Sequence, residues 1–299
     1  MTSPLSKILP YRLTYRDGLV NTLFAAPIRR ARLCKMLEKQ TRGMDDSVTV
    51  IIGIRNRSDY RLRNALWSLR NQNYPSDLVQ IIVVDYGSAA EHRIRTLDLC
   101  NRFNAKCVPL SAPAGWNKPK CINYAIKRTH TKFLLSSDVD VIFPSHYLTE
   151  MVKVLKRNPL AVVYSSMQDL PEDTVETMQN LDATDADIPF KVLLDLATAR
   201  GAGHENAGIN GTFTLHYQYL QGYDEFYEGW GSEDNDLMKR FKNLGLDIIS
   251  LYPTATYLHQ WHPKGEGIAN FQDTARRNRE YYINTRSIIR NGQLWGEVE

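Results

Sequence analysis

The sequence predicts an α/β protein with a mostly parallel, doubly wound sheet of Rossmann type that carries helices on both faces. The chain has 299 residues, 43% of them hydrophobic and 23% charged, which is typical of a folded globular protein. Short β-branched apolar runs recur along it, as in strands buried within a parallel sheet. Segments with helical spacing of apolar residues separate these runs, and this alternation favours successive βαβ units.

The first βαβ unit is expected at 48–88. The run "VTVIIGI" at 48–54 predicts a buried strand. The next segment has a predicted N-cap at Ser58, and we expect its helix to end before Pro75. Its apolar residues recur at helical spacing: Leu62, Ala65, Leu66 and Leu69. The run "VQIIVVDYGS" at 79–88 predicts the second strand and completes the unit.

The alternation continues to residue 166. The expected helices lie at 89–103, 118–129 and 145–157, and the expected strands at 105–110, 132–141 and 160–166. In a doubly wound sheet, ligands gather at the carboxyl ends of the strands. Asp85 and the pair Asp138 and Asp140 lie at such ends, so we expect these carboxylates to face one cleft.

The second half of the chain is less regular. Residues 169–187 are acidic and poor in apolar side chains, which predicts a surface excursion or a lid. Order resumes over 201–246 with a glycine-rich turn, an edge strand, a tight turn and a helix that starts near Ser232. We expect a further strand at 247–253 and a charged, mainly helical tail at 268–299.

Charge is concentrated at the N-terminus. Residues 1–46 hold nine basic and four acidic side chains, whereas the rest of the chain is close to neutral, which argues against a general nucleic-acid binder. The segment "PIRRARLCKMLEKQ" favours a helix that packs on the body with a solvated basic face. Contact of this arm with anionic lipid or a partner is the alternative.

The cysteines and the hydropathy pattern bear on where in the cell the protein is expected. The four cysteines form neither a CxxC pair nor a zinc spacing with histidine, so we expect reduced thiols in a cytosolic protein. The sequence shows neither a long apolar span nor the features of a signal peptide. We therefore expect a cytoplasmic protein, peripheral to the membrane if the basic arm contacts lipid.

Three groups of residues have the chemistry of a site. The pair Asp138 and Asp140 ends an apolar strand, where it can bind Mg²⁺ or Mn²⁺ and leave sites for phosphate oxygens. A strand-end turn capped by aspartate is the alternative interpretation. His259 or His262 can complete an oxygen-rich metal site, and we expect one of the two to be the ligand.

The third group is the segment "FYEGWGSEDNDLMKR". If Ser232 caps a helix, Glu233 and Asp234 occupy its first turn, where the helix dipole favours negative charge. That purely structural interpretation leaves Trp230 unexplained, because a tryptophan between two glycines beside carboxylates is typical of a site that stacks a sugar ring.

The order of these motifs resembles the GT-A glycosyltransferases. The segments "VVDYGS", "NKPKCINYAI", "SSDVDV", "GYDEFYEGWGSEDNDLMKR" and "YLHQWHP" are similar to family 2 enzymes whose C-terminal half carries a galactosyltransferase-type GWGxEDxD module. The resemblance covers about 48–262. It implies metal-dependent transfer of a sugar from a nucleoside-diphosphate sugar to a hydroxyl of a saccharide or glycoconjugate. A UDP-sugar is favoured over a GDP-sugar, and inversion over retention.

The resemblance also implies residue roles. The donor would be bound by Ile54, Arg55, Asp85, Lys118, Asn123 and Asp138, with Asp85 on the uracil or ribose. The metal, Mn²⁺ or Mg²⁺, would be held by Asp140, by His259 in preference to His262, and by Asp138. Glu233 and Trp230 would bind the acceptor, and Asp234 would be the catalytic base.

The implied organisation has four parts. They are a basic arm at 1–46, a nucleotide-sugar-binding half at 47–165, an acceptor-binding and catalytic half at 166–265, and a C-terminal helical tail at 266–299. We expect the tail to be a surface helix, with ordering over the bound donor as the alternative. Ser232 departs from the usual WGGED pattern, which puts the acceptor side in question.

Two rival functions remain. A sugar-phosphate nucleotidyltransferase would carry a glycine-rich loop after its first strand, but this chain has "GIRNRSDY" there. A catalytically inactive carbohydrate-binding relative would have no need of every acid that turnover requires.

Overall fold

The computed structural model describes residues 26–112, 115–181, 189–200 and 208–298 and shows an α/β fold around a seven-stranded sheet. In spatial order the strands are β10 (Asp247–Ser250), β6 (Ala161–Tyr164), β9 (Asn210–Phe213), β4 (Phe133–Ser137), β1 (Val48–Ile54), β2 (Val79–Tyr86) and β3 (Lys106–Leu110). Only β9 among them runs antiparallel to its neighbours. The predicted mostly parallel sheet is confirmed.

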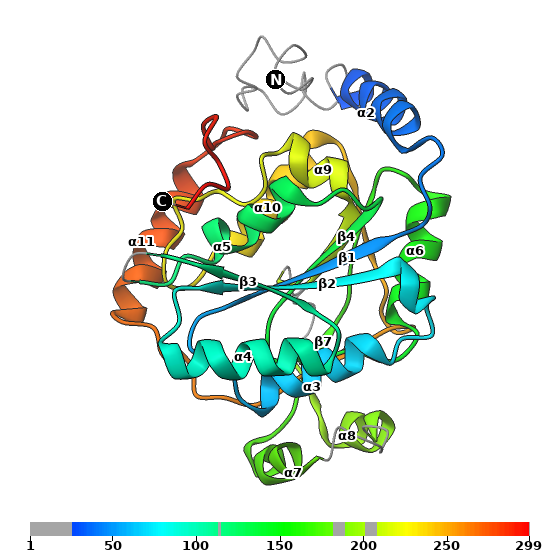
Figure 1. Ribbon diagram of the computed structural model, residues 1–299. Helices are drawn as coiled ribbons and strands as arrows, with labels where there is room; N and C mark the ends of the chain where they lie inside the picture. The colour runs from blue at the N-terminus through cyan, green and yellow to red at the C-terminus, as the bar shows by residue number, and fades with distance from the viewer. Residues whose placement is uncertain (1–25, 113–114, 182–188, 201–207, 299) are drawn as a thin grey trace.

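Helices cover both faces of this sheet (Figure 1). One face carries α3 (Tyr60–Arg70) and α4 (Ala90–Arg102), and the opposite face carries α5 (Lys118–Arg128) and α10 (Glu233–Leu244). The remaining helical elements of the body are the 3₁₀ turn η3 (Ser76–Leu78), α6 (Tyr147–Arg157) and α9 (Thr214–Tyr219). The main hydrophobic core lies between the sheet and these helices, because the central strands are buried along almost their whole length.

A second, four-stranded sheet was not predicted. Its order is β5 (Val141–Ile142), β11 (Tyr257–His259), β7 (Met167–Asp169) and β8 (Thr198–Ala199). The strand predicted at 132–141 is therefore divided: β4 ends at Ser137, and β5 pairs with β11 in the small sheet. The turn between β4 and β5 carries Asp138 and Asp140, and thus joins the two sheets.

Two local predictions were wrong. The strand predicted at the sheet edge is β9, which lies between β4 and β6 with all four residues buried. The N-cap of α3 is Asp59 rather than Ser58, because the Asp59 carboxylate accepts a hydrogen bond from the backbone of Arg61. The Ser58 hydroxyl bonds His92 instead.

The terminal helices pack on the body. α2 (Ala26–Thr41) buries Leu33 and Leu37, and its Arg30 forms an ion pair with Asp247 of β10 at 2.7 Å. This agrees with the packed-helix interpretation of the basic arm, although residues 1–25 lie outside the described chain. The tail helix α11 (Phe271–Asn284) contacts α10.

The predicted excursion at 169–187 contains the 3₁₀ turn η4 (Glu172–Thr174) and the helix α7 (Val175–Asn180), while 182–188 are not described. Together with α8 (Phe190–Leu196), α7 projects from the body (Figure 1). Among the helices of the described ranges, none combines the length and apolar character needed to cross a membrane. All four cysteines lie within those ranges and are unpaired.

Candidate active site

The carboxyl ends of the parallel strands carry the first predicted residues. Ile54 ends β1 and pairs in register with Asp85 of β2. Asp85 is fully buried, and its Oδ1 accepts a hydrogen bond from the Ser88 amide at 2.9 Å. Its Oδ2 lies 3.5 Å from Nε of Arg93 and has no hydrogen-bond partner among the described residues. Arg55, next to Ile54, donates to the carbonyl of Gly115.

A second cluster joins two acids to one lysine. Lys118, at the start of α5, places Nζ 2.7 Å from Oδ1 of Asp138 and 3.1 Å from Oδ1 of Asp234. Gly208 closes the other side, where a Cβ would lie 3.1 Å from Oδ2 of Asp138 and 3.3 Å from Oδ2 of Asp234. The main sheet and the N-terminus of α10 thus bring the predicted donor and base carboxylates together.

Burial and charge oppose each other in this cluster. Burial alone would lower the pKa of Lys118, but the charges of Asp138 and Asp234 raise it well above its ordinary value. Burial raises the pKa of Asp138, although the ammonium of Lys118 partly offsets that effect. We refer to Lys118, Asp138 and Asp234 as the lysine cluster.

A third cluster has the composition of a metal site. One carboxylate oxygen of Asp140 and one ring nitrogen each of His259 and His262 all lie within 4.8 Å of one another. Oδ2 of Asp140 is 3.7 Å from Nε2 of His259 and 3.1 Å from Nε2 of His262. We call these residues the histidine cluster. The sequence predicted one histidine ligand, whereas the structure brings both imidazoles to Asp140.

The charges around Asp140 are consistent with a cation site. Burial would raise the pKa of Asp140, but the two imidazoles hold it well below its ordinary value. The hydrogen bond to Asp140 raises the pKa of His262, against the opposite effect of burial. Asp138, the other predicted metal carboxylate, lies outside this group of three and pairs with Lys118 instead.

The acceptor residues lie at the start of α10. Burial, with a further contribution from Asp234, raises the pKa of Glu233 to about 8. Ser232 has a left-handed backbone, with φ of 73°, instead of the extended conformation typical of a capping residue. Ser232 thus precedes α10 and Glu233 and Asp234 lie in its first turn, as predicted, but the Ser232 side chain makes no capping hydrogen bond. Trp230 is 44% exposed, and the centroid of its ring lies 4.8 Å from that of Phe271.

Asn123 does not line the cleft. It is fully buried, and its amide donates to the Tyr223 carbonyl at 2.8 Å and to Oε1 of Glu225 at 2.9 Å. Its Oδ1 accepts a bond from the Tyr223 amide. All these contacts hold the loop after α9, so the predicted donor contact of Asn123 does not agree with this geometry.

Two residues that support the site were not predicted from the sequence. Asn278 of α11 is fully buried and donates to the carbonyls of Glu228 and Trp230, at 2.8 and 3.1 Å. It therefore fixes the turn that presents Trp230. Asp169 of β7 lies 3.0 Å from Nδ1 of His259. Neither residue belongs to a recognisable motif, and only the tertiary structure brings them to the site.

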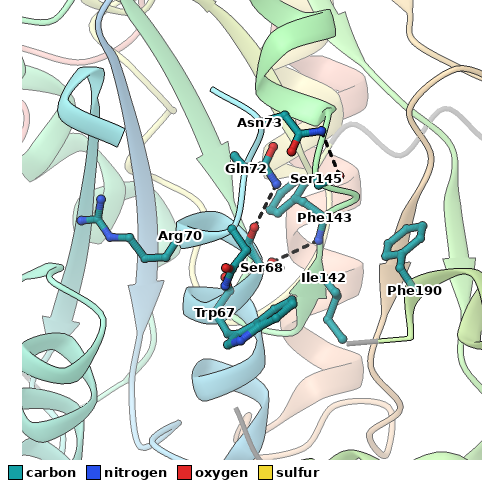
Figure 2. A pocket seen from close by; sticks show the side chains of 10 residues that line it. Trp67, Ser68, Arg70, Gln72, Asn73, Ile142, Phe143, Ser145 and Phe190 are labelled. Atoms are coloured by element: carbon teal, nitrogen blue, oxygen red, sulfur yellow. Dashed lines mark hydrogen bonds between the residues drawn. The ribbon is translucent and has the colours of Figure 1, made fainter. Parts of the chain in front are cut away.

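A hollow elsewhere on the surface has a different chemistry (Figure 2). It lies beside the C-terminal end of α3 and is lined by Trp67, Ser68, Gln72, Phe143 and Ser145, among others. The Ser68 hydroxyl accepts a bond from the Phe143 amide there. Predicted site residues do not occur among the described residues that line it. Clusters of charge, rather than the depth of a pocket, thus identify the candidate site.

Comparisons with known proteins agree with this picture. The model of glycosyl transferase family 2 matches residues 49–214, and a model described as the N-terminal domain of galactosyltransferase matches 195–263. The second match contains the predicted GWGxEDxD segment and both histidines. A search of curated proteins found none that matches the chain at a significant level.

Solved structures share the fold. TarS 1–349 from S. aureus is 19% identical with a TM-score of 0.52, over 72% of this chain and 60% of that one. The same protein in complex with UDP is 16% identical with a TM-score of 0.54, over 80% and 66% of the two chains. GalNAc-T7 with UDP, GalNAc and Mn²⁺ is 13% identical with a TM-score of 0.55, over 75% and 45%.

The chain thus spans only part of these structures, and their likeness confirms the predicted GT-A fold alone. The sequence match is more direct, since it covers over half of the 299 residues and includes β1, β2 and the Asp138–Asp140 turn. On that ground the protein belongs to glycosyl transferase family 2.

Proposed function

We propose that the protein transfers a sugar from a UDP-sugar to a hydroxyl of a saccharide or glycoconjugate, with a divalent cation bound at the histidine cluster. The observation that carries the proposal is the position of the two clusters. The histidine cluster and the lysine cluster begin at Asp140 and Asp138, on one turn at the carboxyl end of β4. The proposed cation site and the proposed base would thus lie close together, as the transfer requires.

The proposed pocket for the nucleotide sugar is placed at Asp85. Its Oδ2 has the ion pair with Arg93 at 3.5 Å but no hydrogen-bond partner among the described residues, so this buried acceptor can take a further bond from a ligand. The N–H of a uracil ring or a ribose hydroxyl supplies the missing donor. Ile54 lies in register beside it, and Arg55 follows. The complexes of TarS with UDP and with UDP-GlcNAc, proteins of the same fold, support a uridine donor.

The ligating atoms of the histidine cluster suit a divalent cation. One carboxylate and two imidazoles suit Mn²⁺ better than Mg²⁺, which prefers oxygen ligands. Asp140, His259 and His262 would hold the ion, and when bound it would neutralise the charge that develops on the diphosphate leaving group. The structure of GalNAc-T7, which contains Mn²⁺ and UDP, supports this assignment.

The acceptor chemistry is assigned to α10 and the turn before it. Trp230 offers an exposed ring on which a sugar can stack. Glu233 keeps its proton near neutral pH, because its pKa is raised to about 8, and can donate a hydrogen bond to the acceptor. Asp234 would take the proton from the attacking hydroxyl as the bond from the sugar to the diphosphate breaks. In-line attack of this kind inverts the anomeric centre.

A thermal-shift panel tests the proposal. Ligands that bind only the folded state stabilise it by mass action, by about 2.7 kcal/mol at a hundred times Kd. We expect one UDP-sugar to raise the unfolding temperature when Mn²⁺ is present and to have little effect without it. Release of UDP with candidate saccharide acceptors then measures turnover. Equal stabilisation with and without the metal, or by none of the nucleotide sugars, would contradict the proposal.

A further inference from the structure

The small sheet places four ionisable side chains in a row. Asp140 immediately precedes β5, His259 ends β11, Asp169 ends β7, and Arg200 follows β8. The strand register aligns them, because His259 lies opposite Asp169 on one side and opposite Val141, next to Asp140, on the other. The row thus leads from the candidate cation site to the surface of the small sheet.

The contacts along this row are direct. Nδ1 of His259 lies 3.0 Å from Oδ1 of Asp169, while its Nε2 faces Oδ2 of Asp140 at 3.7 Å. Arg200 binds the same carboxylate as a fork, with Nε 2.8 Å from Oδ2 and Nη2 2.5 Å from Oδ1 of Asp169. The backbone reinforces the arrangement, since the amide of Leu170 donates to the carbonyl of His259 at 3.0 Å.

These contacts bear on which nitrogen of His259 carries the proton. A neutral imidazole can ligate a cation only through the nitrogen that lacks a proton, and the partner of the other nitrogen decides which one that is. If Nδ1–H donates to Asp169, Nε2 keeps its lone pair on the side of Asp140. His262 has a comparable arrangement, because its Nδ1 lies 3.0 Å from the carbonyl of Pro263.

We propose that Asp169, held by Arg200, is a positioning residue that keeps the proton of His259 on Nδ1 and so leaves Nε2 free to bind the cation. The inference rests on the proposed function, because the cation belongs to that function. Carboxylates that orient a ligating imidazole in this way are a general feature of metal sites in proteins. Neither Asp169 nor Arg200 is itself a ligand in the proposal.

One contact offers the opposite arrangement. Nη2 of Arg200 also lies 3.0 Å from Nδ1 of His259, which would require a lone pair on Nδ1 and a proton on Nε2. The carboxylate is the stronger acceptor for a guanidinium, and Nη2 is closer to it. We therefore assign the Nδ1 proton to the imidazole, and the two arrangements predict different spectra.

The first experiment observes the metal-free wild-type protein. Protein labelled with ¹⁵N-histidine, at a pH above the imidazole pKa, reports the tautomer through two-bond ¹H–¹⁵N correlations, and a His259→Gln sample identifies the signals. We expect His259 to be protonated on Nδ1. A signal with the proton on Nε2 would overturn the proposal without any variant of Asp169.

The second experiment compares Asp169→Asn with Asp173→Asn, the matching change at an exposed acid of the same segment. An asparagine has one acceptor oxygen. If Arg200 takes it, the amide NH₂ faces Nδ1 and favours the wrong tautomer, as an aspartate-to-asparagine change does in a catalytic triad. Titration of Mn²⁺ alone, followed by the electron paramagnetic resonance of the free ion, should show a 10- to 100-fold weaker Kd for Asp169→Asn only.

The outcomes separate this inference from the function on which it rests. If the wild-type protein fails to bind Mn²⁺, the proposed cation site is wrong and the inference falls with it. If the wild type and both variants bind Mn²⁺ equally, the site stands and the role of Asp169 is refuted. A loss for Asp169→Asn accompanied by a switch of the His259 signals to the Nε2 tautomer supports the proposal, and a loss without that switch contradicts it.

Discussion

Asp138 and Asp140 lie on one turn, but the two carboxylates belong to different clusters and have different kinds of partner. The lysine cluster neutralises Asp138 with a cation of the chain itself, since Nζ of Lys118 contacts both Asp138 and Asp234. The histidine cluster surrounds Asp140 with two imidazoles, whose ring nitrogens could ligate a cation as well as pair with the carboxylate. The first cluster is built by the main sheet with α5 and α10, the second by the small sheet and the loop after β11.

This difference indicates a division of labour. A carboxylate that already has an ammonium partner gains little from a metal ion, whereas one that faces imidazole nitrogens gains charge neutralisation from it. Hence we expect the cation to depend on Asp140 and the acceptor chemistry to depend on the lysine cluster. Variants that affect one cluster and not the other test this separation.

The largest effect is expected for Asp140→Asn, because it removes the anionic ligand of the proposed metal site. Loss of the several kcal/mol that a cation contributes to the leaving group should lower turnover by about a thousandfold or more. Binding of Mn²⁺, measured by the resonance of the free ion, should fall in parallel. Asp138→Asn is the matched control and should retain Mn²⁺ binding. Equal loss in both variants would show that the two clusters form one metal site.

The next effect concerns the lysine cluster. Asp234→Asn removes the proposed base but keeps its shape, so turnover should fall by roughly 10²- to 10⁴-fold, the usual contribution of general base catalysis. Binding of Mn²⁺ and of the donor should persist, because the proposed Mn²⁺ site is at Asp140 and the proposed donor pocket is at Asp85. Initial-rate assays with a donor thermal shift measure the two properties separately. Normal turnover in this variant would exclude Asp234 as the base.

The two sheets also differ in how far the sequence predicted them. The runs at 48–54 and 79–88 were recognisable because buried parallel strands are continuously apolar, and β1 and β2 follow them closely. The small sheet has strands of two or three residues, too short to show any periodicity. β5 pairs with β11, more than a hundred residues later, so only tertiary contacts define it.

The candidate site shows the same difference between what the sequence reveals and what tertiary contacts define. Its residues were predicted because carboxylates and histidines stand out in apolar or glycine-rich surroundings, but their partners were not. The ion pairs from Lys118 to Asp138 and Asp234 join segments far apart in the chain. Asn123 was predicted from its motif to contact the donor. Its side chain is buried instead, and its amide donates hydrogen bonds to Tyr223 and Glu225 in the loop after α9. A sequence motif locates a residue on an element, whereas packing decides which partner its side chain meets.

The helix that carries Asp234 depends on the tail, which gives a third test. Arg290 is buried and pairs with Asp224 at 3.2 Å and with Asp236 of α10 at 2.5 Å. Removing Arg290 takes the charged partner from buried Asp224 and leaves Asp236 with Arg240 alone, so Arg290→Ala should lower the free energy of unfolding by about 3–5 kcal/mol. Urea titration measures this change.

Arg276→Ala is the control on the same tail. Arg276 pairs with Asp273 on the surface, where both side chains are more than 70% exposed, so the change should cost at most about 1 kcal/mol. If Arg290→Ala were as mild as this control, the tail would be a dispensable surface helix, as the sequence alone favoured.

The last test concerns the charge balance around Lys118. Glu233, Asp138 and Asp234 surround one ammonium, and burial together with Asp234 raises the pKa of Glu233 from 4.5 to about 8. Between these values the folded protein keeps a proton that the unfolded chain has released. Stability therefore falls as pH rises through this window, by at most about 1.4 kcal/mol per pH unit.

Glu233→Gln removes this titration while keeping a neutral side chain of similar size. Urea titrations at several pH values should therefore show the variant gaining stability relative to the wild type as pH rises from about 4.5 to 8, with a constant difference above that range. The other ionisable groups are common to both proteins, so their contributions cancel in the comparison. Parallel curves across the whole window would mean that Glu233 ionises like an exposed glutamate, and that Lys118 balances three carboxylates rather than two.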